Sequence, residues 1–301
     1  MRFQANRWLS NYKLILNNLL TSIGIYWLFV EIFSYSTNGT TDNITKSFFF
    51  FSSAFSLMLF LSLFRNRPQN SFSHRLRGKD NVIEVKIGDA FDNDGSLVIP
   101  INDHFDVDLG GNVKRSMSLQ AKLISDYYSG KSEHLATDIS SKIDISQIYE
   151  IGKTVEVEQK DKLFFLLVNS KRKTNNRVES TFDDFLVSLS KLWTHIALEA
   201  GRNSTVSIPL ISTNHGRITS LTKSTAIKEI IRSYIESSKH LSIADKLIIC
   251  IHPNEIKIGN VDLDEIDEYL KFSCKHYRVT KISPKPLGKE VAPSSVEEID
   301  Y

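Results

Sequence analysis

The sequence predicts an α/β protein, with a three-layer α/β/α domain preceded by a two-helix transmembrane hairpin. Two long apolar runs, Leu14–Phe33 and Phe48–Phe64, stand near the start of the 301-residue chain. A bilayer core takes about 20 helical residues, with a range of about 17 to 25, so the first run fits well and the second fits at the short limit. After them, strand-like apolar runs alternate with segments of helical periodicity. This order is typical of a sheet covered by helices on both faces.

The two apolar runs are expected to form a helical hairpin, because only the fourteen largely polar residues Ser34–Ser47 separate them. A cleaved signal peptide is the alternative for the first run. Such a signal has a short apolar core followed by a small-residue cleavage site. Leu14–Phe33 is too long, and Glu31–Tyr35 offers no such site. Residues 1–65 are therefore predicted to be a membrane hairpin, with helices over residues 14–33 and 48–64.

Basic residues around the hairpin indicate its orientation, since Lys and Arg gather in short cytoplasmic segments. The residues before the first run and after the second are rich in them: Arg2, Arg7, Lys13, Arg65, Arg67, Arg75, Arg77 and Lys79. The connecting loop has only Lys46. The presence of only two cysteines in the whole chain also suits a cytosolic domain. We expect a multi-pass protein of the inner (cytoplasmic) membrane, with its soluble domain and both termini in the cytoplasm.

Polar side chains interrupt both apolar runs, at Asn17, Asn18, Glu31, Ser52, Ser53, Ser56 and Ser62. Polar groups in hydrocarbon usually face a partner helix or water. Packing within one hairpin explains them, and so does self-association of several hairpins. Because two helices alone cannot enclose a pore, any channel requires several copies.

The rest of the chain divides into three segments. Residues 66–80 are polar and basic and are predicted to be a linker that lies on lipid head groups. Residues 81–283 are enough for one α/β domain. Residues 284–301 hold prolines and an acidic end, which indicates a flexible tail. The net charge of +2 is too small to indicate a nucleic-acid partner, and we expect none.

The first half of the domain opens with two short strands, Val82–Ile87 and Leu97–Ile101, followed by a helix over Ser116–Tyr128. Thr154–Glu158 alternates as a half-exposed strand does. Leu163–Val168 is apolar throughout, which is typical of a central strand covered on both faces.

The second half alternates in the same way. A helix is indicated by apolar residues at helical spacing, which are Phe182, Phe185, Leu186, Leu189, Trp193 and Ile196. Thr181 with Asp184 gives a capping signal at its start. A strand over Val206–Ile211, a helix over residues 227–235, a strand over Lys246–Ile251 and a helix over Leu263–Phe272 complete the pattern.

Candidate ligand-binding residues follow the ends of these strands, where α/β folds bind ligands. Small-residue loops there offer backbone N–H groups to phosphates. Asp and Asn side chains at neighbouring strand ends suit an adenine amine and a ribose hydroxyl. Ordinary βα turns are the alternative explanation. The candidate residues are Asp89, Asn102, Asp103, Gly110, Gly111, Asn112, Val113, Ser212, Thr213, Asn214, His215, Gly216 and Arg217.

These motifs, in this order, resemble a macro domain, the ADP-ribose-binding module, over roughly residues 82–255. The matching features are a strand ending in Gly88-Asp89, a strand LVIPIN ending in Asn102, the glycine loop Gly110–Val113, and the later segment Pro209–Gly216. The resemblance implies that Asp89 accepts from the adenine amine and that Asn102 lies near the distal ribose. It also implies that the two loops hold the diphosphate, with His215 discriminating between ligands.

The whole layout, a two-helix anchor before this domain, resembles the membrane effector of a type II Thoeris anti-phage system. The resemblance implies that a partner TIR-domain protein makes an ADP-ribose-derived signal upon infection, with histidine-conjugated ADP-ribose suggested. The domain then binds the signal, and the membrane segments assemble and compromise the lipid bilayer. Self-association and membrane lipid are therefore expected interactions.

We expect no enzyme activity, no catalytic residue and no cofactor, since neither a Gly-x-Ser-x-Gly elbow nor a catalytic triad can be assigned. The alternative is a membrane-tethered ADP-ribosyl hydrolase, or an ADP-ribose reader. In a hydrolase, Asp103, His104 or Asp106 could supply the general base. No metal is expected, because adjacent Asp103 and His104 rarely converge on one ion.

Overall fold

The computed structural model describes residues 12–39, 47–65, 70–107, 118–174, 177–198, 203–211, 218, 221–259 and 261–278. Its strands are β1 (Ser71–Arg75), β2 (Val82–Ile87), β3 (Ser96–Asn102), β4 (Thr154–Gln159), β5 (Lys162–Arg172), β6 (Val178–Glu179), β7 (Asn203–Pro209) and β8 (Ala244–Ile251). Its helices are α2 (Tyr12–Ser36), α4 (Phe48–Arg65), α5 (Leu119–Tyr127), α6 (Ser132–Ser140), α7 (Phe182–Leu198), α8 (Lys223–Ser238), α9 (Pro253–Gly259) and α10 (Leu263–Lys275), with a 3₁₀ helix η1 (Ala90–Asp92).

One mixed sheet organises the domain, with strand order β1-β2-β8-β7-β3-β5-β4 and β6 pairing with β5 off this path. The inner pairs β2–β8, β8–β7, β7–β3 and β3–β5 are parallel. β1 and β4 run antiparallel at the two edges. The carboxyl ends of β2, β8, β7, β3 and β5 therefore meet at the same edge of the sheet, and this edge is where a ligand is expected.

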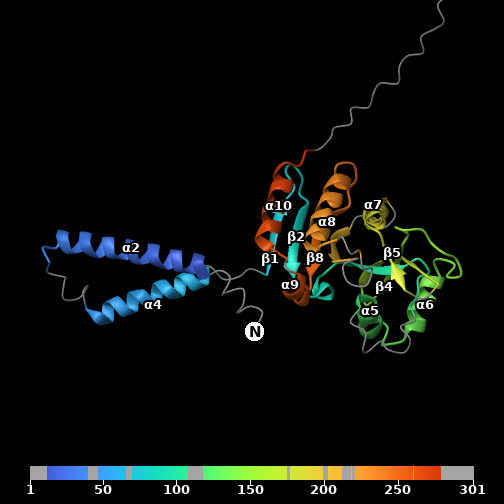
Figure 1. Cartoon of the computed structure of the whole chain (residues 1–301), viewed down its shortest axis with the longest axis horizontal. Helices are drawn as coiled ribbons and strands as arrows, with labels where there is room; N and C mark the ends of the chain where they lie inside the picture. Colours follow the sequence, from blue (N-terminus) through green and yellow to red (C-terminus); the bar gives the residue numbers. More distant parts are fainter. Residues whose placement is uncertain are drawn as a thin grey trace, which may run out of the picture.

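Helices cover both faces of the sheet, so the expected three-layer arrangement is confirmed (Figure 1). On one face, α7, α8 and α10 bury a core that includes Trp193 and Tyr234. On the other face, η1, α5 and α6 bury a second core that includes Leu123 and Phe164. The capping signal of α7 is also confirmed, because Thr181 Oγ1 accepts from Asp184 N at 3.0 Å and Thr181 N donates to Asp184 Oδ2 at 3.1 Å.

Both apolar runs near the start of the chain are helices, and they contact each other. The ring of Tyr26 on α2 lies 6.4 Å from the rings of Phe50 and Phe51 on α4. By length and composition, only Leu16–Ser36 qualifies as a membrane span within the described residues, while Phe49–Phe64 is apolar but shorter. The second helix was expected at the short limit, and a hairpin that spans the membrane twice therefore stays a prediction.

The segment expected to be a linker, residues 66–80, is in part a strand. β1 pairs antiparallel with β2 along Ser71–Arg75, so the prediction of a plain linker is wrong there. Phe72 packs against the core, and His74 Nε2 lies 2.7 Å from Asp267 Oδ1 on α10. A strand at the edge of a sheet is hydrogen-bonded along one side only and needs few apolar residues. β1 has a single large apolar side chain, Phe72, so the polar composition of this segment did not indicate a strand.

Other elements were not expected at all, namely α6, α9, β6 and η1. The predicted flexible tail, residues 284–301, lies outside the described residues.

The two cysteines are buried free thiols, and they give a first prediction. Burial raises the pKa of Cys250 to about 12 and that of Cys274 to about 11. Because the thiolate is the nucleophile, neither cysteine is expected to react with iodoacetamide at about pH 8 in the folded protein. Both are expected to react after unfolding in guanidinium chloride. Mass spectrometry of the alkylated chain counts the labelled thiols, and native labelling of Cys250 would contradict the packing described here.

Candidate functional site

The carboxyl edge of the sheet gathers the described candidate residues. Gly88 and Asp89 follow β2, Asn102 ends β3 and Asp103 follows it. His252, which was not a predicted candidate, follows β8 at the same edge. The remaining candidates lie outside the described residues: Gly110, Gly111, Asn112, Val113, Ser212, Thr213, Asn214, His215, Gly216 and Arg217. Their predicted roles stay predictions. Both of these segments follow strands that end at this same edge, β3 and β7.

Asp89 sits at the corner between β2 and η1. Its Oδ1 accepts from Phe91 N at 3.0 Å, which caps η1, and its Oδ2 accepts from Lys122 Nζ on α5. Burial alone would raise the pKa of this carboxyl, but the bonds from Lys122 and Phe91 N and the positive charge of Lys122 lower it overall. Asp89 is therefore an ionised acceptor, 29% exposed, at the edge where a ligand is expected.

Gly88, the residue before Asp89, has open space above it. A Cβ placed on Gly88 meets no atom of the described residues within 4 Å, and its φ does not lie in the left-handed region. Neither backbone strain nor packing against this part of the chain therefore requires glycine here. By contrast, a Cβ on Gly95 would lie 2.5 Å from Thr205 O. The free space at Gly88 permits close approach of a ligand to the backbone.

The η1 segment is held in place by two lysines that sequence reasoning missed. Lys86 Nζ on β2 donates to Asn93 Oδ1 at 2.6 Å. Lys162 Nζ on β5 donates to the carbonyl oxygens of Phe91 and Asn93, at 2.8 and 2.6 Å. Burial lowers the pKa of Lys162. Asn93 is 5% exposed and also donates to Cys250 Sγ at 2.9 Å. These bonds fix the backbone that presents Asp89.

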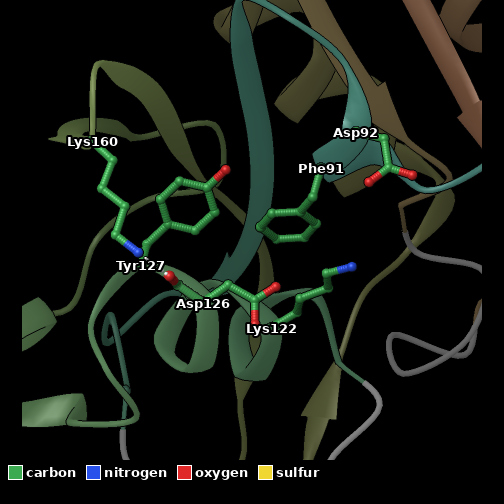
Figure 2. Close-up of a pocket in the computed structure, with 6 residues that line it drawn as sticks. All are labelled: Phe91, Asp92, Lys122, Asp126, Tyr127 and Lys160. Atoms are coloured by element: carbon green, nitrogen blue, oxygen red, sulfur yellow. Dashed lines mark hydrogen bonds between the residues drawn. The ribbon is translucent and has the colours of Figure 1, made fainter.

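A pocket of about 340 Å³ opens beside this corner, between η1, α5 and the β4–β5 turn. Figure 2 shows its lining residues, which are Phe91, Asp92, Lys122, Asp126, Tyr127 and Lys160. The rings of Phe91 and Tyr127 lie 6.0 Å apart. Lys122 Nζ lies 5.1 Å from the centre of the Phe91 ring, and the same amine bonds Asp89. Lys122 therefore belongs both to the pocket and to the corner.

The side chain of Asn102 forms its hydrogen bonds within its own loop. Its Oδ1 accepts from the backbone N–H groups of His104 and Asp106, both at 3.1 Å, and its Nδ2 donates to Asp106 Oδ2 at 2.9 Å. These bonds cap the end of β3. The amide holds residues 102–106 in a tight turn.

Asp103 points inward, since its side chain is 8% exposed. Its Oδ1 accepts from Arg172 N at 2.9 Å and lies 2.8 Å from His104 Nδ1. The backbone N of Asp103 donates to Ser170 O at 3.0 Å, and the backbone O of Asp103 accepts from Tyr149 N at 2.8 Å. The geometry gives Asp103 the role of joining the loop to β5, which the sequence pattern did not indicate.

Asp106 and Arg172 form an ion pair at the same edge. Arg172 Nη1 donates to both carboxylate oxygens of Asp106, at 3.0 and 2.8 Å. The two side chains are about one third exposed. Sequence reasoning missed Arg172, because it closes a strand far along the chain from the loop that it contacts.

Comparison with known proteins places these features in a family. The family model described as Thoeris protein ThsA, Macro domain, matches residues 83–252. No curated protein matches the chain.

Among solved structures, the chain is similar to a macrodomain variant from Oceanobacillus iheyensis, with 14% identity and a TM-score of 0.44. The match covers 68% of this chain and 96% of that one. It is also similar to another variant of that macrodomain, described as holding ADPR, with 13% identity and a TM-score of 0.41 over 66% of this chain and 99% of that one.

Proposed function

The chain belongs to the Thoeris ThsA macro-domain family, and from this premise we propose that it is an anti-phage effector that senses an ADP-ribose-derived signal. The family links the chain functionally to a TIR-domain partner, and the macro domain is an ADP-ribose-binding fold. The observation that carries the proposal is the corner formed by Gly88 and Asp89. An ionised carboxylate stands there beside backbone that no described residue obstructs, at the carboxyl edge of the sheet.

In this proposal, Asp89 accepts a hydrogen bond from the adenine amine of the signal. Both of its oxygens already have donors within the protein, Phe91 N and Lys122 Nζ. A carboxylate oxygen has lone pairs for more than one donor, so the amine either joins Lys122 or displaces it. Residues 110–113 and 212–217 hold the diphosphate, and histidine-conjugated ADP-ribose is the form of signal that we propose.

We further propose that the domain binds its signal without consuming it. Hydrolysis would require a base near the distal ribose, and Asp103, His104 and Asp106 were the candidates. The contacts of Asp103 and Asp106 support a structural role, since Asp103 is bonded to β5 and Asp106 is paired with Arg172. Release of ADP-ribose from a labelled ADP-ribosylated protein by this chain would favour the alternative, a membrane-tethered hydrolase.

Signal binding is proposed to drive assembly of several copies, and the assembled membrane helices disrupt the bilayer and stop growth or kill the cell. Leu16–Ser36 supports the membrane location. Ligand can drive assembly only if it binds the assembled state more tightly than the dispersed one. The Lys and Arg asymmetry supports an inner-membrane protein with both termini in the cytoplasm.

Substitution of Asp89 tests the ligand site. Asp89→Ala is expected to weaken ADP-ribose binding by about 1–3 kcal/mol, or roughly 5- to 150-fold, because the ligand's donor loses its acceptor. The matched control is Asp94→Ala, which removes an exposed carboxylate from the same β2–β3 connection. Calorimetry on the full-length protein measures both affinities. Equal affinity for ADP-ribose in the Asp89→Ala variant and the parent would show that the ligand does not bind at Asp89.

A further inference from the structure

The chain leaves the membrane helices and enters the domain beside the candidate site. β1 lies beside β2 (Figure 1) and runs antiparallel to it. Ser71 lies opposite Lys86. One residue earlier, Asn70 O accepts from Ile87 N at 2.7 Å. Ile87 is followed directly by Gly88 and Asp89. Asn70, the first described residue after α4, is thus hydrogen-bonded to Ile87, the residue that precedes the Gly88–Asp89 corner.

Two consecutive amides connect this corner to two different parts of the protein. Ile87 N donates to Asn70 O, and Gly88 N donates to Ile251 O at 3.1 Å. The first bond leads to the membrane segment, and the second leads to the end of β8, next to His252. A ligand that moves the Gly88–Asp89 backbone therefore displaces the point at which the anchor is attached.

The connection to the membrane helix is short. α4 ends at Arg65, and the five residues to Asn70 span at most about 18 Å when fully extended. On the domain side β1 is held firmly, since His74 bonds Asp267 and Arg77 N donates to Cys274 O at 3.1 Å. Asn70 therefore lies within about 18 Å of the end of α4, and a displacement of Asn70 beyond this distance requires α4 to move with it.

We propose that the Asn70–Ile87 junction transmits occupancy of the ligand corner to α4. The inference rests on the proposed function and names the regulation of that same site. Ligand bound at Gly88 and Asp89 sets the position of Ile87, and β1 with the short connection passes this change to the membrane helix. The coupling is mechanical, so it requires the connection to stay short.

A flexible insertion tests this coupling. In one full-length variant a short Gly/Ser segment is inserted directly after Arg65, and in a matched control the same segment is inserted after Gly39, in the connection between α2 and α4. ADP-ribose is the probe. Calorimetry measures binding, and size-exclusion with light scattering in detergent measures assembly. The variant inserted after Arg65 is expected to bind ADP-ribose within about twofold of the parent but to stay small, while the parent and the control form larger species.

Hydrogen exchange adds a readout that does not depend on assembly. In the parent, ADP-ribose is expected to change the exchange of β1 amides and of Ile87, and to leave the distant edge strand β4 unchanged. Ligand-driven assembly of the variant inserted after Arg65, to the same extent as the parent, would overturn the inference. Unchanged exchange throughout β1 upon binding would also overturn it. Absence of ADP-ribose binding in the parent itself would instead contradict the proposed function and, with it, this coupling.

Discussion

Replacing Gly88 with valine is expected to reduce ADP-ribose binding strongly while leaving the fold intact. Valine is compatible with the protein fold at this position, because a Cβ there meets no atom of the described residues within 4 Å and the backbone is not in the left-handed region. In the complex, its branched side chain would occupy the space that the ligand needs. Overpacking of this kind costs about 1–3 kcal/mol, which is roughly 5- to 150-fold in affinity.

The measurements for Gly88→Val are calorimetry with ADP-ribose and a thermal unfolding curve. The matched control is Gly95→Val, where the backbone has a positive φ and a Cβ would lie 2.5 Å from Thr205 O. The control is expected to lower the melting temperature, whereas Gly88→Val is not. Normal binding by a well-folded Gly88→Val protein would show that no ligand approaches this backbone.

Deleting residues 1–69 is expected to abolish membrane damage and to leave the affinity for ADP-ribose unchanged. Among the described residues, neither hydrophobic core includes a residue of α2 or α4. The shortened chain retains β1 and therefore keeps the whole sheet. It lacks the helices that are proposed to disrupt the bilayer, so cells that express it with the TIR partner are expected to survive signalling.

The measurements for the shortened chain are calorimetry and survival of infected cells. Calorimetry serves as the folding control. If the shortened chain binds ADP-ribose with normal affinity, a loss of toxicity cannot be attributed to misfolding. If the shortened chain still kills cells once signalling begins, the membrane mechanism is wrong. An enzymatic role of the macro domain would then replace it.

The strands of the sheet were predictable where burial makes the sequence uniformly apolar. Leu163–Val168 and Lys246–Ile251 lie within β5 and β8, which are covered on both faces. β1 was missed because an edge strand needs few apolar residues, and Ser71–Arg75 contributes only Phe72 to the core. Its place in the sheet depends on pairing with β2, which no local pattern reveals.

Asp89 could be predicted as a site residue because it stands at the end of a strand. The lysines that hold Asp89 and its segment in place could not be predicted from the sequence. Lys86 and Lys162 stand in strands, where a lysine usually indicates an exposed position, yet their amines reach the backbone or side chain of the η1 segment. Lys122 meets Asp89 only because α5 packs on the same face as η1. Such contacts arise from tertiary packing, and their sequence separation hides them.

The bond between Gly88 N and Ile251 O has a consequence for how the protein is made. The ribosome synthesises the membrane helices first and β2 soon after, but β8, the neighbour of β2, is among the last strands to emerge. Pairings between distant segments form late, since the intervening chain must first be closed into a loop. The two N-terminal apolar helices are therefore synthesised long before the Gly88–Asp89 corner is complete. Under the proposed function, products that terminate before β8 would carry α2 and α4 without a complete ligand corner, and they are expected not to respond to the signal.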